Sequence, residues 1–447
     1  MDFLKAKEKG IFFIIKAVLS HFAMAPFLLL FGVVCWFFGY TEFLILFYVL
    51  IFTLILLFCE DLKNLFPMVL YVSYFLEDIN WGAPVEVYAM AIGVAIVALI
   101  SFLVKNIITK RSKLKKGDMF VGLIFAIVAF SIGGIGRFNL TYFLITLGLF
   151  ASTYVLYFIA RNFTVDFKNY LPNLFVCGAF IVTVQLAIGN YRLGFFSGVD
   201  KHVVYLGAQN VNVVSEMFFF GTVSAIYLGI GKKRDWAYLL FSLTPLLGIY
   251  MTYCRTTYAI AIVFTVALTI LMVIKSPNKR AFIIGLSVFV LLLILAFIAF
   301  YNKIIEELAP MLDKFGDNGR LQHLWPWCWA RFKEYPYFGF GFVADEHIPN
   351  TYAKYYVVLA HNTPLQWLTS LGVVGSSILT YFYLEKYRIV FRKMTIKKFV
   401  YASVIFSLAC AGIFDQAPTM DFFMFLTPLI VIASFEDEES DKPKLLY

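Results

Sequence analysis

Three arginines and one histidine stand out in a chain that is otherwise dominated by apolar residues: Arg192, Arg255, Arg320 and His361. A guanidinium group can bind a phosphate through two parallel hydrogen bonds, and an imidazole can take up or release a proton near neutral pH. Side chains of these types at the edge of a bilayer suit chemistry on an anionic, lipid-linked substrate. They therefore favour an enzyme over a pore.

Two of the arginines have acidic residues nearby in sequence, which gives each of them a structural alternative. Arg192 can pair with Asp200 or with a lipid phosphate, and Arg320 can pair with Asp313 or Asp317. An ion pair of this kind needs no substrate. Both interpretations, ion pair and substrate contact, stay open for each arginine.

Arg255 and His361 have alternatives of another kind. Arg255 stands at the end of an apolar hairpin, where a long cationic side chain can extend to the lipid headgroups. His361 is followed by Asn362 and Pro364, a pattern typical of the start of a helix. Any one of these residues alone is weak support for a site, and the set is stronger because all are expected on the same side of the membrane.

A tryptophan-rich segment follows Arg320. Trp325, Trp327 and Trp329 predict an aromatic belt on a short interfacial helix. Such a helix would hold Arg320 and Arg331 at the depth of the lipid headgroups, where a lipid diphosphate lies.

The remaining polar positions carry less weight. Asn210 could bind sugar hydroxyls, although capping of the next helix is the more common role. The GFGF segment at Gly339–Phe342 predicts a turn, because it lacks the third glycine of a dinucleotide-binding motif. Three further histidines rank second: His202 and His347 lie in outer loops without partners at useful spacing, and His323 follows Arg320 by three residues.

Composition fixes the class of protein. The chain has 447 residues, of which 61% are apolar and 15% charged, and many apolar runs approach the length that crosses a bilayer. This predicts an all-α polytopic membrane protein with about 12–14 transmembrane helices and one large extracytoplasmic loop containing short interfacial helices. The lysine-rich N-terminus has no cleavage site after a short apolar core, so the first span is expected to be retained. The expected spans lie near residues 22–39, 41–59, 65–80, 84–104, 119–135, 138–160, 171–188, 209–230, 236–253, 256–274, 281–300, 362–384, 399–414 and 422–434.

Basic residues are concentrated in four segments between these spans, at 105–116, 232–234, 275–280 and 386–398. The positive-inside rule assigns all four to the cytosol, together with both termini. Membrane orientation explains the net charge of +9, so no nucleic-acid partner is expected. The six cysteines are scattered without a CxxC pair, so neither a disulfide framework nor a structural metal is expected.

The longest polar segment between apolar runs divides the chain into three parts, which belong to one integrated domain. Residues 1–300 are expected to form a transmembrane helical bundle with short loops, and residues 301–361 an extracytoplasmic catalytic loop. Residues 362–447 are expected to hold the C-terminal spans and an acidic cytosolic tail. The acidic segment 436–441 is expected to be solvated and without a role.

The stretch from Gly319 to Gly375 resembles the bacterial O-antigen ligase and O-antigen polymerase family, membrane glycosyltransferases of the GT-C-like class. The shared pattern is an Arg after a Gly, a Trp, a Pro-x-x-Gly-x-Gly turn, a His-Asn pair, and a Leu with paired glycines downstream. It is carried here by Gly319, Arg320, Trp327, Pro336, Gly339, Gly341, His361, Asn362, Leu365, Gly372 and Gly375. Weaker matches are Arg192-Leu193-Gly194 and Cys254-Arg255, where the family has Ser-Arg at the start of a helix.

The resemblance implies transfer of a glycan from undecaprenyl diphosphate to a sugar hydroxyl, on the outer face of the bacterial cytoplasmic (inner) membrane and without a cofactor or metal. The diphosphate leaves as a stable anion, so the reaction needs charge neutralisation and removal of the acceptor proton rather than a general acid. The outer loops contain no Asp-x-Asp pair, which agrees with a metal-independent, inverting reaction. The expected roles are diphosphate binding by Arg192, Arg255 and Arg320, catalysis by His361 and Arg320, and support by Arg331, Asn362 and Asn210.

The acceptor distinguishes two activities within this family. A polymerase extends a lipid-linked repeat unit, whereas a ligase transfers the glycan to a lipid A core. The abundance of Phe, Tyr, Ile and Lys favours a polymerase, because it is typical of AT-rich surface-polysaccharide genes. Membrane lipids, a chain-length regulator and a flippase are the further expected partners. A lipid-linked oligosaccharide transporter is the alternative from another class, and it is disfavoured because the notable charges lie at the outer boundary rather than at the midplane.

Overall fold

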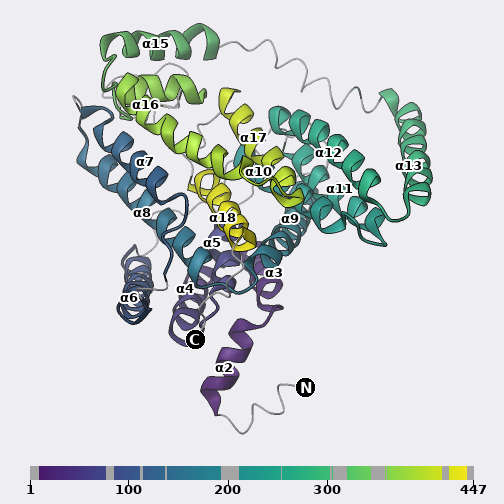
Figure 1. Ribbon diagram of the computed structural model, residues 1–447, viewed down its shortest axis with the longest axis horizontal. Coiled ribbons are helices and arrows are strands. Elements are labelled where there is room, and N and C mark those ends of the chain that lie inside the picture. Colours follow the sequence, from purple (N-terminus) through teal and green to yellow (C-terminus); the bar gives the residue numbers. More distant parts are fainter. Residues whose placement is uncertain are drawn as a thin grey trace.

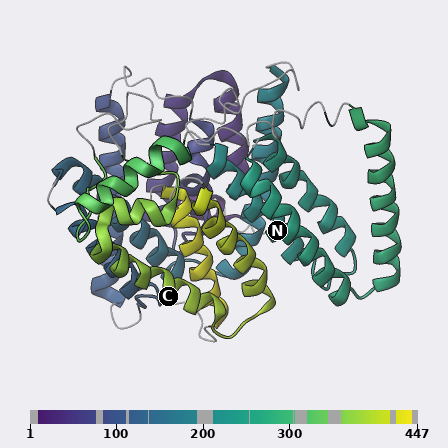
Figure 2. The same ribbon diagram turned by 90° about the horizontal axis from the view of Figure 1, so that it is seen from above.

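The computed structural model describes residues 10–76, 85–110, 114–135, 138–192, 211–252, 254–302, 305, 320–343, 358, 360–414 and 422–439. Within these residues the chain forms helices and no strand (Figures 1 and 2). The helices are α2 (Ile11–Ser20), α3 (Met24–Phe38), α4 (Thr41–Phe58), the 3-10 helix η2 (Lys63–Leu65), α5 (Phe66–Phe75), α6 (Val85–Lys110), α7 (Phe120–Ile132), α8 (Leu140–Asn162), α9 (Phe167–Arg192), α10 (Val211–Gly229), α11 (Asp235–Met251), α12 (Arg255–Lys275), α13 (Lys279–Ala299), the π-helix η6 (Arg320–Leu324), α15 (Trp325–Glu334), α16 (Thr363–Phe391), α17 (Ile396–Phe414) and α18 (Phe422–Glu439).

The all-α polytopic fold expected from the sequence is confirmed, and each expected apolar segment overlaps a helix. In the described part of the chain, 7 helices are long and apolar enough to cross a membrane: α4, α9, α10, α12, α13, α16 and α17. Helices α2 and α3 could form one more span, bent by 79°. The expected number of about 12–14 spans is larger because it included apolar segments whose helices are shorter than 18 residues, such as α5 and α7.

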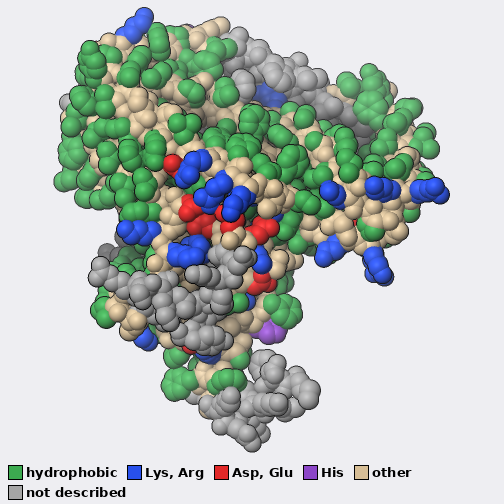
Figure 3. All heavy atoms as spheres, in the orientation of Figure 1, with side chains coloured by type: hydrophobic (Ala, Val, Ile, Leu, Met, Phe, Trp, Pro, Cys, Tyr) green, Lys and Arg blue, Asp and Glu red, His purple; other side chains and the backbone are tan. Residues whose placement is uncertain are grey.

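The outer surface of the bundle is apolar where lipid would contact it. Only 6% of the apolar stretch of α13 is buried within the protein. In Figure 3, hydrophobic side chains cover much of the upper part of the molecule, and Lys and Arg side chains gather in its middle and near the ends of α11 to α13. This division between apolar and basic surface is that of a multi-pass membrane protein.

The four basic segments lie at one end of the bundle. Arg392 Nη2 is 2.6 Å from Asp118 Oδ2, which joins the segment after α16 to the segment before α7. The rings of Tyr227 and Tyr401 are 6.2 Å apart, which places the end of α10 beside the start of α17. Helices α10 and α12 run side by side in the same direction, so the basic loops that follow them share this end.

The stretch 386–398, expected to be a loop between two spans, is a loop only between Phe391 and Ile396. Helix α16 continues to Phe391, so Lys386 lies within the helix, where it is 6% exposed. Its ammonium group is 4.2 Å from the centre of the Tyr383 ring, and the residue lines a small cavity between α16, α17 and α18. Lys398 is also buried and donates a 3.0 Å hydrogen bond to the carbonyl of Ile389. Aromatic faces and carbonyl groups make the burial of these cations tolerable.

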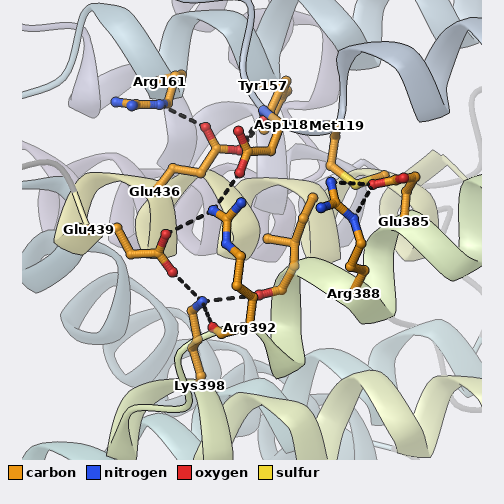
Figure 4. Close-up of polar contacts among 11 residues, drawn as sticks. Asp118, Met119, Tyr157, Arg161, Glu385, Arg388, Arg392, Lys398, Glu436 and Glu439 are labelled. Carbon is orange, nitrogen blue, oxygen red and sulfur yellow. Dashed lines mark hydrogen bonds and ion pairs between the residues drawn. The ribbon is translucent and has the colours of Figure 1, made fainter.

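The acidic segment that begins at Glu436 is not the solvated end expected from the sequence. Glu436 is 5% exposed and accepts a 2.8 Å hydrogen bond from Arg161 Nε (Figure 4). It also accepts hydrogen bonds from the hydroxyl of Tyr157 and from the backbone amide of Asp118. The end of α18 is therefore fixed to α8 and to the loop before α7. Residues 440 and 441 lie outside the described residues.

Glu439 extends the same cluster toward α16 and α17. It pairs with Arg392 at 2.8 Å and with Lys398 (Figure 4). Burial by itself would raise the pKa of Glu439, but the hydrogen bonds from Lys398 and Arg392 outweigh this effect and lower the pKa. The ionised form is therefore favoured, and the C-terminal helix is held by charge pairs at the basic end of the bundle.

We expect Glu436→Ala to reduce the free energy of unfolding by about 3–5 kcal/mol, because it leaves the Arg161 guanidinium buried without its partner. The matched control is Glu60→Ala. Glu60 pairs with Lys16 at 3.3 Å, the two side chains are 52% and 43% exposed, and such surface pairs contribute about 0–1 kcal/mol. Chemical denaturation of the detergent-solubilised variants measures both changes. Equal losses in the two variants would contradict the structural role of the Glu436 cluster.

Candidate functional site

Helix α15 lies across the start of α16, at the end of the bundle opposite the basic segments (Figure 1). Trp325 Nε1 donates a 2.9 Å hydrogen bond to the carbonyl of Ala360. Trp325 and Trp327 are partly buried, and Trp329 is exposed, so the expected aromatic belt is only partly a surface feature. A small apolar core separate from that of the bundle holds α15 in place and consists of Leu324, Cys328, Phe340, Val358 and Ala360.

Cys328 belongs to this small core and not to a reactive centre. Burial raises the pKa of its thiol to about 12, against a smaller opposing effect of the Thr369 hydroxyl. A thiol with such a pKa carries almost no thiolate near neutral pH. Its role is packing between α15 and α16.

A break in α16 receives the turn that follows α15. Gly372 has φ 65° and ψ −172° inside α16, which interrupts the helix and frees the carbonyl groups before it. The amide of Phe340 donates to the carbonyl of Thr369 at 2.7 Å, and the amide of Gly341 donates to that of Ser370 at 3.2 Å. The expected turn at 339–342 is thus tied to α16 by backbone hydrogen bonds.

The glycines of the Pro-x-x-Gly-x-Gly segment make this close approach possible. A Cβ atom on Gly339 would lie under 3.0 Å from the backbone of Ser370, and a Cβ atom on Gly372 would lie equally close to the backbone of Tyr337. Both glycines also have positive φ angles, which other L residues rarely adopt. The signature glycines therefore join the segment carrying Arg320 to the helix that follows His361.

His361 has an unusual backbone conformation immediately before α16. Its φ of 48° is rare for a residue other than glycine, although His is enriched among the exceptions. Asn362 is the N-cap, and its side chain accepts a 2.9 Å hydrogen bond from the amide of Leu365. The same side chain donates to the carbonyl of Ile413 at 2.9 Å. Asn362 therefore fixes His361 between α16 and the end of α17.

Arg255 is the first residue of α12, and Cys254 is the N-cap. Cys254 Sγ lies 3.3 Å from Thr257 Oγ1, where the serine of the family pattern would place its hydroxyl. Amide groups at a helix N-terminus favour an anion, whereas a cation there is unfavourable unless it also meets an anion. The position of Arg255 therefore suits a residue that binds an anionic group.

The other predicted site residues are described to different extents. Arg320 begins η6, directly before α15. Arg192 ends α9 at the same end of the bundle as the start of α10, although only its backbone is described. Asn210, and the suggested partners Asp200, Asp313 and Asp317, lie outside the described residues. Arg331 forms a 2.5 Å ion pair with Glu334 and lies 5.6 Å from the ring centre of Phe340, so it also connects α15 to the turn at 339–342.

Glu216 is a buried residue at this end that was not expected from the sequence. It is 2% exposed and lies one and a half turns into α10. Its carboxylate accepts a 2.8 Å hydrogen bond from Thr257 of α12 and a 3.3 Å hydrogen bond from Ser407 of α17. The signal in the sequence was a glutamate within an otherwise apolar helix, which is costly unless it has a role.

Comparison with known proteins agrees with the sequence pattern. Residues 239–380 match the model of a family described as O-antigen ligase. This range contains Arg255, Arg320, His361 and Asn362, whereas Arg192 precedes it. No curated protein matches the chain. The match over residues 239–380 therefore confirms the expected resemblance to the O-antigen ligase and polymerase family.

Proposed function

We propose that the chain is a membrane enzyme of the O-antigen ligase and polymerase type, because residues 239–380 match the model of a family described as O-antigen ligase. Within this type, we propose that it is a polymerase of lipid-linked glycan repeats. The donor is an oligosaccharide repeat unit on undecaprenyl diphosphate. The acceptor is a hydroxyl of a second lipid-linked repeat. The active site faces the extracytoplasmic side of the bacterial cytoplasmic membrane, and both termini are cytosolic.

The proposed reaction is a direct displacement at the anomeric carbon of the donor sugar. The acceptor oxygen forms a bond to this carbon while the bond to the diphosphate oxygen breaks, so the configuration inverts. His361 takes the proton of the acceptor hydroxyl, and undecaprenyl diphosphate leaves with the bonding electron pair. The diphosphate is stable as an anion and requires no proton from a general acid.

Charge neutralisation is the second requirement of this reaction. We assign it to Arg192, Arg255 and Arg320, because guanidinium groups bind phosphate oxygens through paired hydrogen bonds. Arg331 and Asn362 support the site by holding α15 and the start of α16 in place. Asn210 stays a proposed contact to the sugar.

One observation carries this proposal. Arg255 begins α12 and His361 precedes α16, and α17 contacts residues beside both of them at the end of the bundle opposite the basic segments. Ser407 of α17 contacts Glu216 beside α12, and Ile413 of α17 binds Asn362 beside His361. Under the positive-inside rule, this end faces outward. Lipid-linked repeats are extended on that side of the membrane in the proposed reaction.

The second candidate is an O-antigen ligase, which transfers the completed glycan to a lipid A core. It is favoured by the description of the family that residues 239–380 match. The two activities share the donor and the proposed roles of His361 and the arginines. They differ only in the acceptor.

We expect purified protein in lipid nanodiscs to elongate lipid-linked repeat units when no lipid A core is present. Gel separation of the products would show a ladder of glycans of increasing length. Product formation that requires a lipid A core would instead assign the ligase activity. Movement of a labelled lipid across liposome membranes, without any new glycosidic bond, would contradict both and indicate a transporter.

A further inference from the structure

A buried carboxylate links the starts of α10 and α12 to α17. Glu216, Thr257 and Ser407 are each 2% exposed or less. Thr257 Oγ1 donates to Glu216 Oε1 at 2.8 Å, and Ser407 Oγ lies 3.3 Å from Glu216 Oε2. Ser215 Oγ adds a 3.0 Å hydrogen bond to Thr257 Oγ1. Three helices therefore meet at one acidic side chain.

This cluster lies just below the proposed diphosphate site. Glu216 follows the first residue of α10 by five positions, which is roughly 8 Å along the helix. Thr257 is two residues after Arg255, in the first turn of α12. Glu216 therefore holds the Thr257 hydroxyl in the same helical turn that carries Arg255.

The same cluster extends to the histidine side of the site. Ser407 is followed six residues later on α17 by Ile413, whose carbonyl accepts the hydrogen bond from Asn362. A rigid segment of α17 therefore separates the Glu216 contact from the residue next to His361. Movement of Ser407 away from Glu216 would change the separation of Arg255 and His361.

We propose that Glu216 is a positioning residue, whose carboxylate holds Arg255 at the donor diphosphate by fixing the first turn of α12 against α17. This inference rests on the proposed glycosyl-transfer function. It gives a role to a glutamate that lies inside a membrane helix, where an ionisable residue is costly without one. Glu216 touches neither donor nor acceptor in this proposal and acts through Thr257 and Ser407.

The test measures binding of undecaprenyl diphosphate, without acceptor, to the full-length protein in nanodiscs. We expect Glu216→Ala to weaken binding about tenfold, because a small displacement of a binding group is costly. Glu216→Gln should stay within about threefold of wild type. Its carbonyl can accept from Thr257, and its amide can donate to the Ser407 hydroxyl. Ser407→Ala tests the same link and should weaken binding in the same direction.

Tyr401→Phe is the matched control. The Tyr401 hydroxyl lies 2.6 Å from Ser224 Oγ, and this buried pair joins the same helices, α10 and α17, farther from the site. The control should bind undecaprenyl diphosphate as wild type does, within about threefold. A loss in this variant equal to that of Glu216→Ala would reduce Glu216 to a general packing role and overturn the proposal.

A double mutant distinguishes positioning of Arg255 by Glu216 from an independent contribution of Glu216 to the binding of undecaprenyl diphosphate. If Glu216 acts through Arg255, Glu216→Ala combined with Arg255→Ala should bind no more weakly than Arg255→Ala alone. Additive losses of binding in the double mutant overturn the proposal. Equal losses of binding in Glu216→Gln and Glu216→Ala also overturn it, because they would show that the negative charge of Glu216 itself is needed. Failure of wild type to bind undecaprenyl diphosphate overturns both the proposed function and this inference. Binding by wild type that Glu216→Ala leaves unchanged overturns this inference alone.

Discussion

His361→Ala and Arg320→Ala are each expected to abolish glycan extension while leaving the protein in the membrane. A general base contributes about 10²- to 10⁴-fold to the rate, and loss of a group that stabilises developing charge costs about 10²- to 10³-fold. We therefore expect extension rates below about 1% of wild type in both variants. The measurement is incorporation of a labelled repeat unit into longer glycans, normalised to the amount of protein in the membrane.

The backbone of His361 strengthens the prediction for that residue. A φ of 48° outside glycine is maintained only where the surrounding structure imposes it, and such residues cluster at functional sites. Asn362 supplies that constraint through its contacts to Leu365 and Ile413. His361→Ala removes the imidazole, whereas the contacts of Asn362 do not involve the side chain of His361.

Suitable controls are Lys333→Ala and His21→Ala. Lys333 is an exposed basic residue on α15, and His21 lies in the bend between α2 and α3. Both should retain near-normal extension, because neither is at the proposed site. Near-normal activity in both His361→Ala and Arg320→Ala would refute the catalytic assignment.

Gly372→Ala is expected to disrupt the site from a distance. The new Cβ would lie under 3.0 Å from the backbone of Tyr337, and alanine is strained at a φ of 65°. Together these effects should reduce the free energy of unfolding by about 3 kcal/mol or more. Separation of α15 from α16 should also lower the extension rate by at least about 10²-fold, since it displaces Arg320 relative to His361.

The matched control for this substitution is Gly285→Ala. Gly285 lies within α13, and nothing lies within 4 Å of a Cβ atom built there. Alanine is favoured over glycine in a helix interior by about 1 kcal/mol, so this variant should be unchanged or slightly more stable. Thermal unfolding in detergent and the extension assay report the two effects separately. Similar behaviour of Gly372→Ala and Gly285→Ala would show that the break in α16 does not need glycine.

The signature residues were recognisable in the sequence, but the structure divides their roles. Gly339, Gly341 and Gly372 allow the backbone of the 339–342 turn to approach the backbone of α16, so their role is structural. Asn362 caps α16 and binds α17. Among the signature residues, His361 and Arg320 are therefore the ones we assign to the reaction itself.

Some features depend on contacts that local sequence does not contain. Glu216 accepts hydrogen bonds from Thr257 and Ser407, which are 41 and 191 positions away in the sequence. Glu436 accepts hydrogen bonds from Arg161 and Tyr157, which are 275 and 279 positions away. In the sequence, the first is a single glutamate in an apolar run, and the second is part of an acidic tail. Only packing of distant helices shows that both are buried and paired.

The match of residues 239–380 to the family model comes from the sequence alone. The sequence by itself also determined that the chain forms apolar helices and where these helices lie. These properties follow from apolar length and from hydrogen bonds between residues four positions apart, and both are local. The tertiary structure alone decided which of the polar residues lie side by side. The break at Gly372, the contact of Asn362 with α17 and the burial of Glu216 and Glu436 all require helices that meet only after the bundle has packed.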